Sequence, residues 1–178
     1  MISDVIRLHY GYNTWATERI LAAADGLTTE QLTTDGHAGN GSILTTLIHT
    51  IDRQQAWFAW FNGSMSAEEA IVQEIDPARV TNLAGLRTVW DEINERTTRF
   101  IAAGSDDEFN RIMTLEFPNG FSKDVPLWNL LLHVANHGTQ HRAEVAAMLT
   151  EHSCSPGALD MLFYLIDPGT GAMGREAD

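Results

Sequence analysis

Apolar residues recur every three or four positions in four long stretches of the chain, and this spacing is typical of amphipathic helices. Serine or asparagine stands at the start of the first three stretches and glycine follows each of them, while a proline precedes the fourth. Four long helices joined by shorter irregular segments predict a helix bundle. The predicted helices cover, approximately, residues 4–24, 42–62, 83–103 and 127–149.

The same spacing predicts which face of each helix packs inward. The second helix has a broad apolar face that starts at Ile43 and ends at Phe61. A second stripe, through His49, Ala56 and Trp60, lies away from the centre of that face, so it fits either a cleft between helices or a subunit contact. For the first helix, the predicted inward residues are Val5, Leu8, Tyr12, Trp15 and Ala22.

Shorter signals occupy the connections. Thr28 to Gln31 resembles a capping box that opens a short helical turn. Residues 63–82 include a helical piece at Ala67 to Val72, and their length could cross about 30 Å, so the helices they join can be parallel neighbours. Residues 33–41 and 105–110 are rich in polar residues and are expected to be loops.

Residues 111–125 depart from the helical pattern. Two short runs flank Pro118-Asn119-Gly120, and Asn-Gly is a strong signal for a tight turn. We therefore expect a small β-hairpin directly before Pro126, which suits the start of the fourth helix. After that helix, residues 159–166 predict a short apolar helix.

Composition is consistent with one globular domain. The chain has 178 residues, of which 44% are apolar, and it shows no internal repeat. We expect an all-α domain over residues 1–168, a four-helix bundle with a β-hairpin insert, followed by a flexible tail at 169–178. The sequence lacks a long apolar run and a secretory signal pattern, and the single Cys154 cannot form an internal disulfide, so we expect a cytoplasmic protein.

The charge balance argues against polyanionic partners. The formal net charge is −13, and the 11 lysine and arginine residues are spread thinly. Phosphate backbones and anionic membranes are bound by clustered basic side chains, so neither is expected as a partner. The acidity is expected to favour solubility.

Candidate chemistry is concentrated in the fourth predicted helix, where His133, His137 and His141 follow one another at intervals of four residues. Residues four apart lie on one side of a helix, one turn apart. His141 falls within the apolar stripe, His137 on its border and His133 on the flank. Burying a polar ring without a partner costs about 2–7 kcal/mol, and a metal ion is a partner that two rings can share.

Geometry limits which rings share one ion. His133 and His141 are about 12 Å apart along the helix axis, whereas bonds from zinc to imidazole are about 2.1 Å long. One ion therefore takes an adjacent pair, and the helical wheel favours His137 with His141. A third ligand must come from elsewhere, and among the other histidines only His49 lies in a second strong helical pattern, downstream of the first helix. The other histidines, expected to face solvent, are His9, His37 and His152.

The alternatives to a metal site are ordinary ones. His137 and His141 could form a hydrogen-bonded pair at a helix border, and His49 could be a polar edge residue. A zincin motif is excluded because Gly138 stands where that motif needs glutamate, and the Glu-x-x-His motifs of di-iron bundles are absent. We assign no catalytic role to Cys154.

No general base is evident from the sequence. Asp52 follows His49 by three positions, and Glu144 follows His141 by three, so each carboxylate shares a helix side with a candidate ligand. Either could orient an imidazole, as could His133, or be an ordinary solvated side chain. The following tryptophans are expected to form core or subunit contacts rather than a substrate wall: Trp15, Trp57 and Trp60.

A histidine early in the second helix, an aromatic cluster after it and the segment NHGTQHR in the fourth helix together resemble the DinB/YfiT-like superfamily. The resemblance extends over nearly the whole chain, including the helix order and the hairpin-like insert. A bare HxxxH is a weak motif, but the preceding Asn, the following Arg and the upstream His make it fairly specific. The chain departs from its relatives at Ala143-Glu144, where Gly-Gln is common, and the departure concerns substrate contacts rather than metal ligands.

The resemblance implies a four-helix bundle, often dimeric, with one divalent metal held by His49, His137 and His141. Nickel or zinc is the expected ion, and iron or manganese is also compatible. Members include thiol S-transferases that use bacillithiol, mycothiol or glutathione, a thiol-dependent isomerase and metal-dependent hydrolases. The implied function is a metal-dependent transferase or hydrolase acting on a small molecule, with a thiol as cosubstrate. The alternative is a dimeric bundle that binds metal or ligand without turnover.

Overall fold

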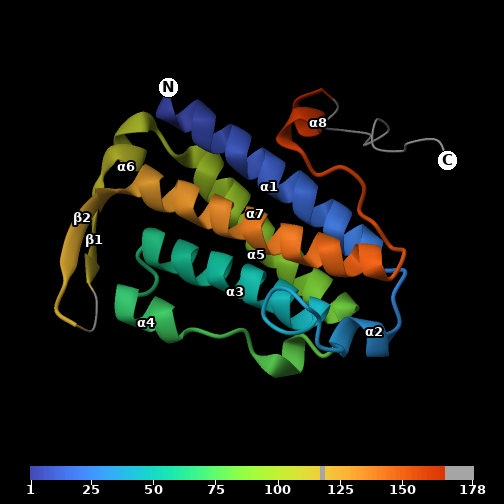
Figure 1. The fold of residues 1–178 in the computed structure, drawn as a ribbon. Coiled ribbons are helices and arrows are strands. Elements are labelled where there is room, and N and C mark those ends of the chain that lie inside the picture. The colour runs from blue at the N-terminus through green and yellow to red at the C-terminus, as the bar shows by residue number, and fades with distance from the viewer. Residues whose placement is uncertain (117–118, 167–178) are drawn as a thin grey trace.

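The computed structural model describes residues 1–116 and 119–166 and confirms the predicted four-helix bundle (Figure 1). Each predicted long helix is present, with boundaries within two residues of those expected. The predicted tail at 169–178 and residue Pro118 of the predicted turn lie outside the described residues. The four long helices are α1 (Ile2–Ala24), α3 (Ile43–Phe61), α5 (Leu83–Ala103) and α7 (Leu127–Glu151).

Each long helix packs against two others. Helix α7 packs against α1 and α3, and α5 packs against the same two helices. Helices α1 and α7 run in one direction, and α3 and α5 run in the opposite direction (Figure 1). The long connection at 63–82 therefore joins two parallel neighbours, and it carries α4 (Ala67–Val72) and the 3₁₀ turn η1 (Pro77–Arg79).

Local hydrogen bonds explain where several helices begin. Ser42 forms a capping box with Thr45 at the start of α3, and Asn82 accepts from the amide of Gly85 at the start of α5. The expected box at Thr28 starts the short α2 (Thr29–Thr33). The predicted hairpin is present as β1 (Ile112–Glu116) and β2 (Ser122–Pro126), an antiparallel pair that leads directly into α7.

Three expectations from the sequence about α1 and residues 105–110 were wrong. The inward face of α1 is not the stripe through Val5 and Leu8, because these residues are exposed. The buried face carries polar residues among apolar ones, and its members are Ser3, Ile6, Tyr10, Asn13, Ala16, Thr17, Ile20 and Leu21. Ser3 does not cap α1 as predicted; its own amide donates to Asp106 Oδ1 over 2.8 Å.

The third wrong expectation concerns residues 105–110, which include Asp106 and were predicted to form a loop. This segment contains a short helix, α6 (Asp106–Asn110), capped by Ser105 and anchored by the fully buried Phe109. The apolar segment near the end of the chain forms α8 (Met161–Ile166), whose Tyr164 ring contacts Tyr12 and Trp15 on the outer side of α1. Within the described residues, every helix is too short or too polar to span a lipid bilayer.

The apolar core consists of two clusters separated along the bundle by a layer of buried polar side chains. One cluster lies around the C-terminal halves of α1 and α7 and the N-terminal halves of α3 and α5, and the other lies at the opposite end. Between them, the buried polar residues are Asn13, Thr17, Gln54, Thr97, His141 and Arg142.

Hydrogen bonds run through this polar layer from helix to helix. Arg142 of α7 donates to Asn13 Oδ1 of α1 over 2.5 Å, and Asn13 Nδ2 donates to Gln54 Oε1 of α3 over 3.1 Å. Gln54 Nε2 then donates to Thr97 Oγ1 of α5 over 3.1 Å. All four long helices are thereby connected by side-chain hydrogen bonds at the same level of the bundle.

We expect Gln54→Met to lower the free energy of unfolding by about 1–3 kcal/mol, because it keeps the approximate shape of the side chain but leaves the Asn13 amide without its acceptor. Urea unfolding measures this change. Gln55→Met, at a half-buried neighbour outside this chain of hydrogen bonds, is the matched control. Equal losses in both variants would contradict the role assigned to Gln54.

Candidate metal centre

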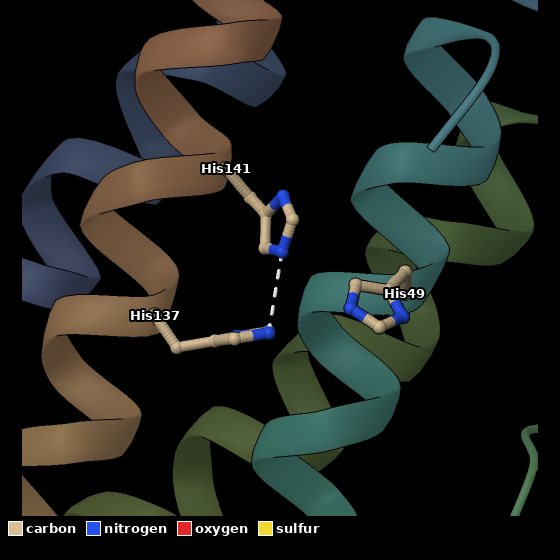
Figure 2. Close-up of side chains that lie close together, drawn as sticks. All are labelled: His49, His137 and His141. Carbon is tan, nitrogen blue, oxygen red and sulfur yellow. Dashed lines mark hydrogen bonds between the residues drawn. The ribbon is translucent and has the colours of Figure 1, made fainter. Parts of the chain in front are cut away.

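The structure brings together the three histidines that the sequence singled out. His137 and His141 lie one turn apart on α7, and His49 lies on α3, the antiparallel neighbour of α7. Because the Ser42 cap sets the start of α3, His49 falls about two turns into that helix, at the level of the α7 pair. Figure 2 shows the three rings in the space between the two helices.

The distances within this group suit a single ion. Each histidine offers one nitrogen such that all three atoms lie within 4.8 Å of one another. The Nε2 atoms of His137 and His141 are 3.2 Å apart. Two nitrogens on one tetrahedral zinc would be about 3.4 Å apart, given bonds of about 2.1 Å. The donor set and its spacing therefore fit a divalent metal of the kind that binds imidazole.

The environment keeps two of these rings neutral. Burial, together with the charges of His141, His49, His133 and Arg53, lowers the pKa of His137 to about 4. Burial is also the largest cause that lowers the pKa of His49, and the charges of His141 and Arg53 add to it. A neutral imidazole has a free lone pair, which is the form that a metal needs.

A carboxylate contacts the buried ring of the group. Glu144 Oε2 lies 2.5 Å from His141 Nδ1, and Gln140 donates to the other carboxylate oxygen over 3.2 Å. Burial alone would raise the pKa of Glu144, but the hydrogen bonds from His141 and Gln140 leave that pKa lowered. Of the two alternatives left open for the nearby carboxylates, Glu144 therefore shows contact with an imidazole.

Asp52, the other carboxylate considered, has a different partner. Asp52 is only 6% exposed and forms an ion pair with Arg53 at 2.6 Å. Among the described hydrogen bonds, none joins Asp52 to His49. Arg53 also donates to the carbonyl groups of Ile71 and Gln73, which ties the end of α4 to α3. Arg53 was not predicted as a neighbour of the site, although its position four residues after His49 places it on the same helix side.

His133 stands outside the three-histidine group. Its ring is exposed, lies 6.2 Å from the His137 ring between centroids, and meets the edge of Trp57 at 5.3 Å. Trp57 in turn contacts Trp60 and Phe61, so His133 of α7 meets an aromatic cluster on α3. His133 also lines the groove between α1 and α7 and does not join the three-histidine group.

The remaining histidines are remote from this group. His37 and His152 are exposed, as expected. His9 is half-buried, contrary to expectation, and lines a groove of about 800 Å³ between α1, α7 and residues 159–161. None of the three grouped histidines lines that groove.

Comparison with known proteins agrees with this architecture. The model of the DinB family matches residues 1–169. The chain belongs to the DinB family. Protein DinB of Bacillus subtilis (strain 168) is 24% identical over 166 residues, which cover 92% of this chain and 95% of that protein.

A solved structure shares the fold of this family member. YfiT from Bacillus subtilis aligns with a TM-score of 0.60 and 17% identity, over 85% of this chain and 87% of YfiT. That protein is described as "a probable metal-dependent hydrolase with an unusual four-helix bundle topology". At this level of identity the likeness establishes the shared fold and leaves the chemistry to be argued from the site.

We expect His137→Ala to remove most of the bound divalent metal, because this ring offers one of the three nitrogens that lie within 4.8 Å of one another. His133→Ala should retain the metal, since its ring is exposed and outside the group. Elemental analysis of protein purified without a poly-histidine tag measures the metal content. Equal loss from both variants would mean that a different pair of α7 histidines holds the ion.

The lowered pKa values also predict how the metal-free protein responds to acid. Between about pH 6.5 and pH 4 the unfolded chain binds protons that the folded His137 does not, so the free energy of unfolding should fall as the pH falls through this window. Urea unfolding in the presence of a chelator measures the slope. His137→Ala should flatten it, and His37→Ala, at an exposed loop residue, should not; an unchanged slope in His137→Ala would contradict the assignment.

Proposed function

We propose that this protein is a divalent-metal-dependent enzyme that transfers a low-molecular-weight thiol to a small molecule or hydrolyses one. The observation that carries the proposal is the convergence of His49, His137 and His141, whose nitrogens lie within 4.8 Å of one another on two facing helices. Three histidine ligands leave a tetrahedral ion one open position, which is the arrangement of catalytic rather than structural sites. Nickel or zinc is the proposed ion, and iron or manganese has compatible ligand chemistry.

When bound, such an ion supplies Lewis acidity that favours the deprotonated form of a water or a thiol at neutral pH. The chain's own residues hold the three ligand rings and keep two of them neutral. Aromatic rings lie next to the site, because Trp57 and His133 meet edge to face and the His133 ring is near that of His137. These rings limit water and offer an apolar surface to a small substrate.

The nearby carboxylates favour thiol transfer over a hydrolysis that depends on a separate general base. Asp52 is engaged by Arg53, and Glu144 is engaged by His141 and Gln140. A thiol needs no base beyond the ion, because its ordinary pKa of about 8.5 is already close to neutrality. Hydrolysis stays within the proposal, since the solved relative YfiT is described as a probable metal-dependent hydrolase.

The metal-loaded protein should catalyse conjugation of at least one thiol, among glutathione, bacillithiol, mycothiol and cysteine, with an electrophile such as 1-chloro-2,4-dinitrobenzene, or cleave a p-nitrophenyl ester. Absorbance assays follow both reactions. His137→Ala should abolish the activity because it removes the metal. His133→Ala should keep the metal, so any loss of activity in that variant reports the role of the His133 ring beside the site. A metal-loaded protein inactive in every combination would favour the alternative, a bundle that binds metal or ligand without turnover.

A further inference from the structure

His141 differs from the other two histidines in how its ring is held. It is the buried member of the group, with 7% of its surface exposed. Its Nδ1 atom lies 2.5 Å from Glu144 Oε2, and its Nε2 atom faces His137 Nε2 at 3.2 Å. The two nitrogens of one ring therefore have different partners, one a carboxylate and the other a second imidazole.

This difference determines where the ring carries its proton. An ionised carboxylate only accepts hydrogen bonds, so the atom that meets Glu144 must be an N–H. In a neutral imidazole, a proton on Nδ1 leaves the lone pair on Nε2. The lone pair of His141 then points toward His137, into the space that the three candidate ligands enclose.

The carboxylate itself has a fixed orientation. Gln140 donates to Glu144 Oε1 over 3.2 Å while Oε2 meets His141, so each oxygen has a partner. All three residues lie on α7 at intervals of one and three positions, and the Glu144 side chain is 24% exposed. The contact is therefore built into one helix and needs no movement of another element to form.

We propose that Glu144 is a positioning residue for the metal centre: it holds His141 with Nε2 directed at the divalent ion and Nδ1 protonated, and its negative charge makes the ring a stronger ligand. This inference rests on the proposed metal site. Outer carboxylates that bind metal-ligating histidines typically contribute 10- to 100-fold to metal affinity, because they select the tautomer and the ring orientation.

Two substitutions separate the parts of this role. Glu144→Ala removes both the acceptor and the charge, and Glu144→Gln keeps an acceptor for Nδ1–H but removes the charge. Glu151→Ala, an exposed carboxylate on the same helix, is the matched control. Dissociation constants for Zn²⁺ and Co²⁺ are measured by titrating each metal-free protein, and thermal unfolding of the same samples checks that each variant is folded.

We expect Glu144→Ala to weaken binding of both ions by roughly 10- to 100-fold, Glu144→Gln to fall between it and the wild type, and Glu151→Ala to match the wild type. A wild-type protein that binds neither ion would overturn the proposed metal site. A wild-type protein that binds both, with Glu144→Ala equally tight, would overturn the role of Glu144 alone.

A second measurement does not depend on metal. Nitrogen-15 NMR of the metal-free protein reports which ring nitrogen carries the proton, and we expect Nδ1–H for His141 in the wild type and in Glu144→Gln. In Glu144→Ala the proton should be shared with Nε2, since the selecting acceptor is gone. Should Glu144→Ala fail to fold, the wild-type tautomer together with the metal affinity of Glu144→Gln decides the matter; Nε2–H in the wild type would refute the proposal.

Discussion

The arrangement of this bundle depends on a charged side chain buried between α1 and α7. Arg142 is 3% exposed and has hydroxyl and amide partners rather than a carboxylate. Burial lowers its pKa to about 10, which still leaves it charged at neutral pH. A buried cation is costly without good hydrogen bonds, so the packing of α1 and α3 around α7 must keep Asn13 and Gln54 in place.

This constraint also fixes the candidate ligands. Arg142 follows His141 directly, and the arginine reaches α1 while the histidine ring lies against His49 of α3. Gly138 serves the same arrangement: a Cβ atom there would lie 2.8 Å from Arg142 Nη1 and 2.9 Å from Asn13 Oδ1. The segment NHGTQHR thus combines residues of the candidate metal site with residues that pack α7 against α1.

The long helices and the candidate histidines could be predicted from the sequence, and the wrong predictions share a cause. Caps and helical spacing located the helices, but the inward face of α1 was misassigned because Asn13 and Thr17 are buried through hydrogen bonds that span the bundle. Periodicity also could not predict which neighbour His49 faces, because that depends on the packing of α3 against α7. It likewise did not predict that Asp52 is buried against Arg53. Local patterns specify elements, whereas these polar contacts are set by tertiary neighbours.

The separation of His49 from its two companions along the chain has a consequence for biosynthesis. About half of the polypeptide lies between them, and α7 is the last long helix to emerge during translation. A cation joining the two segments would close a long loop, and so would restrict the unfolded ensemble much as a covalent cross-link does. Loading of such a cation would therefore require α7, because a product ending before α7 would contain His49 without His137 and His141.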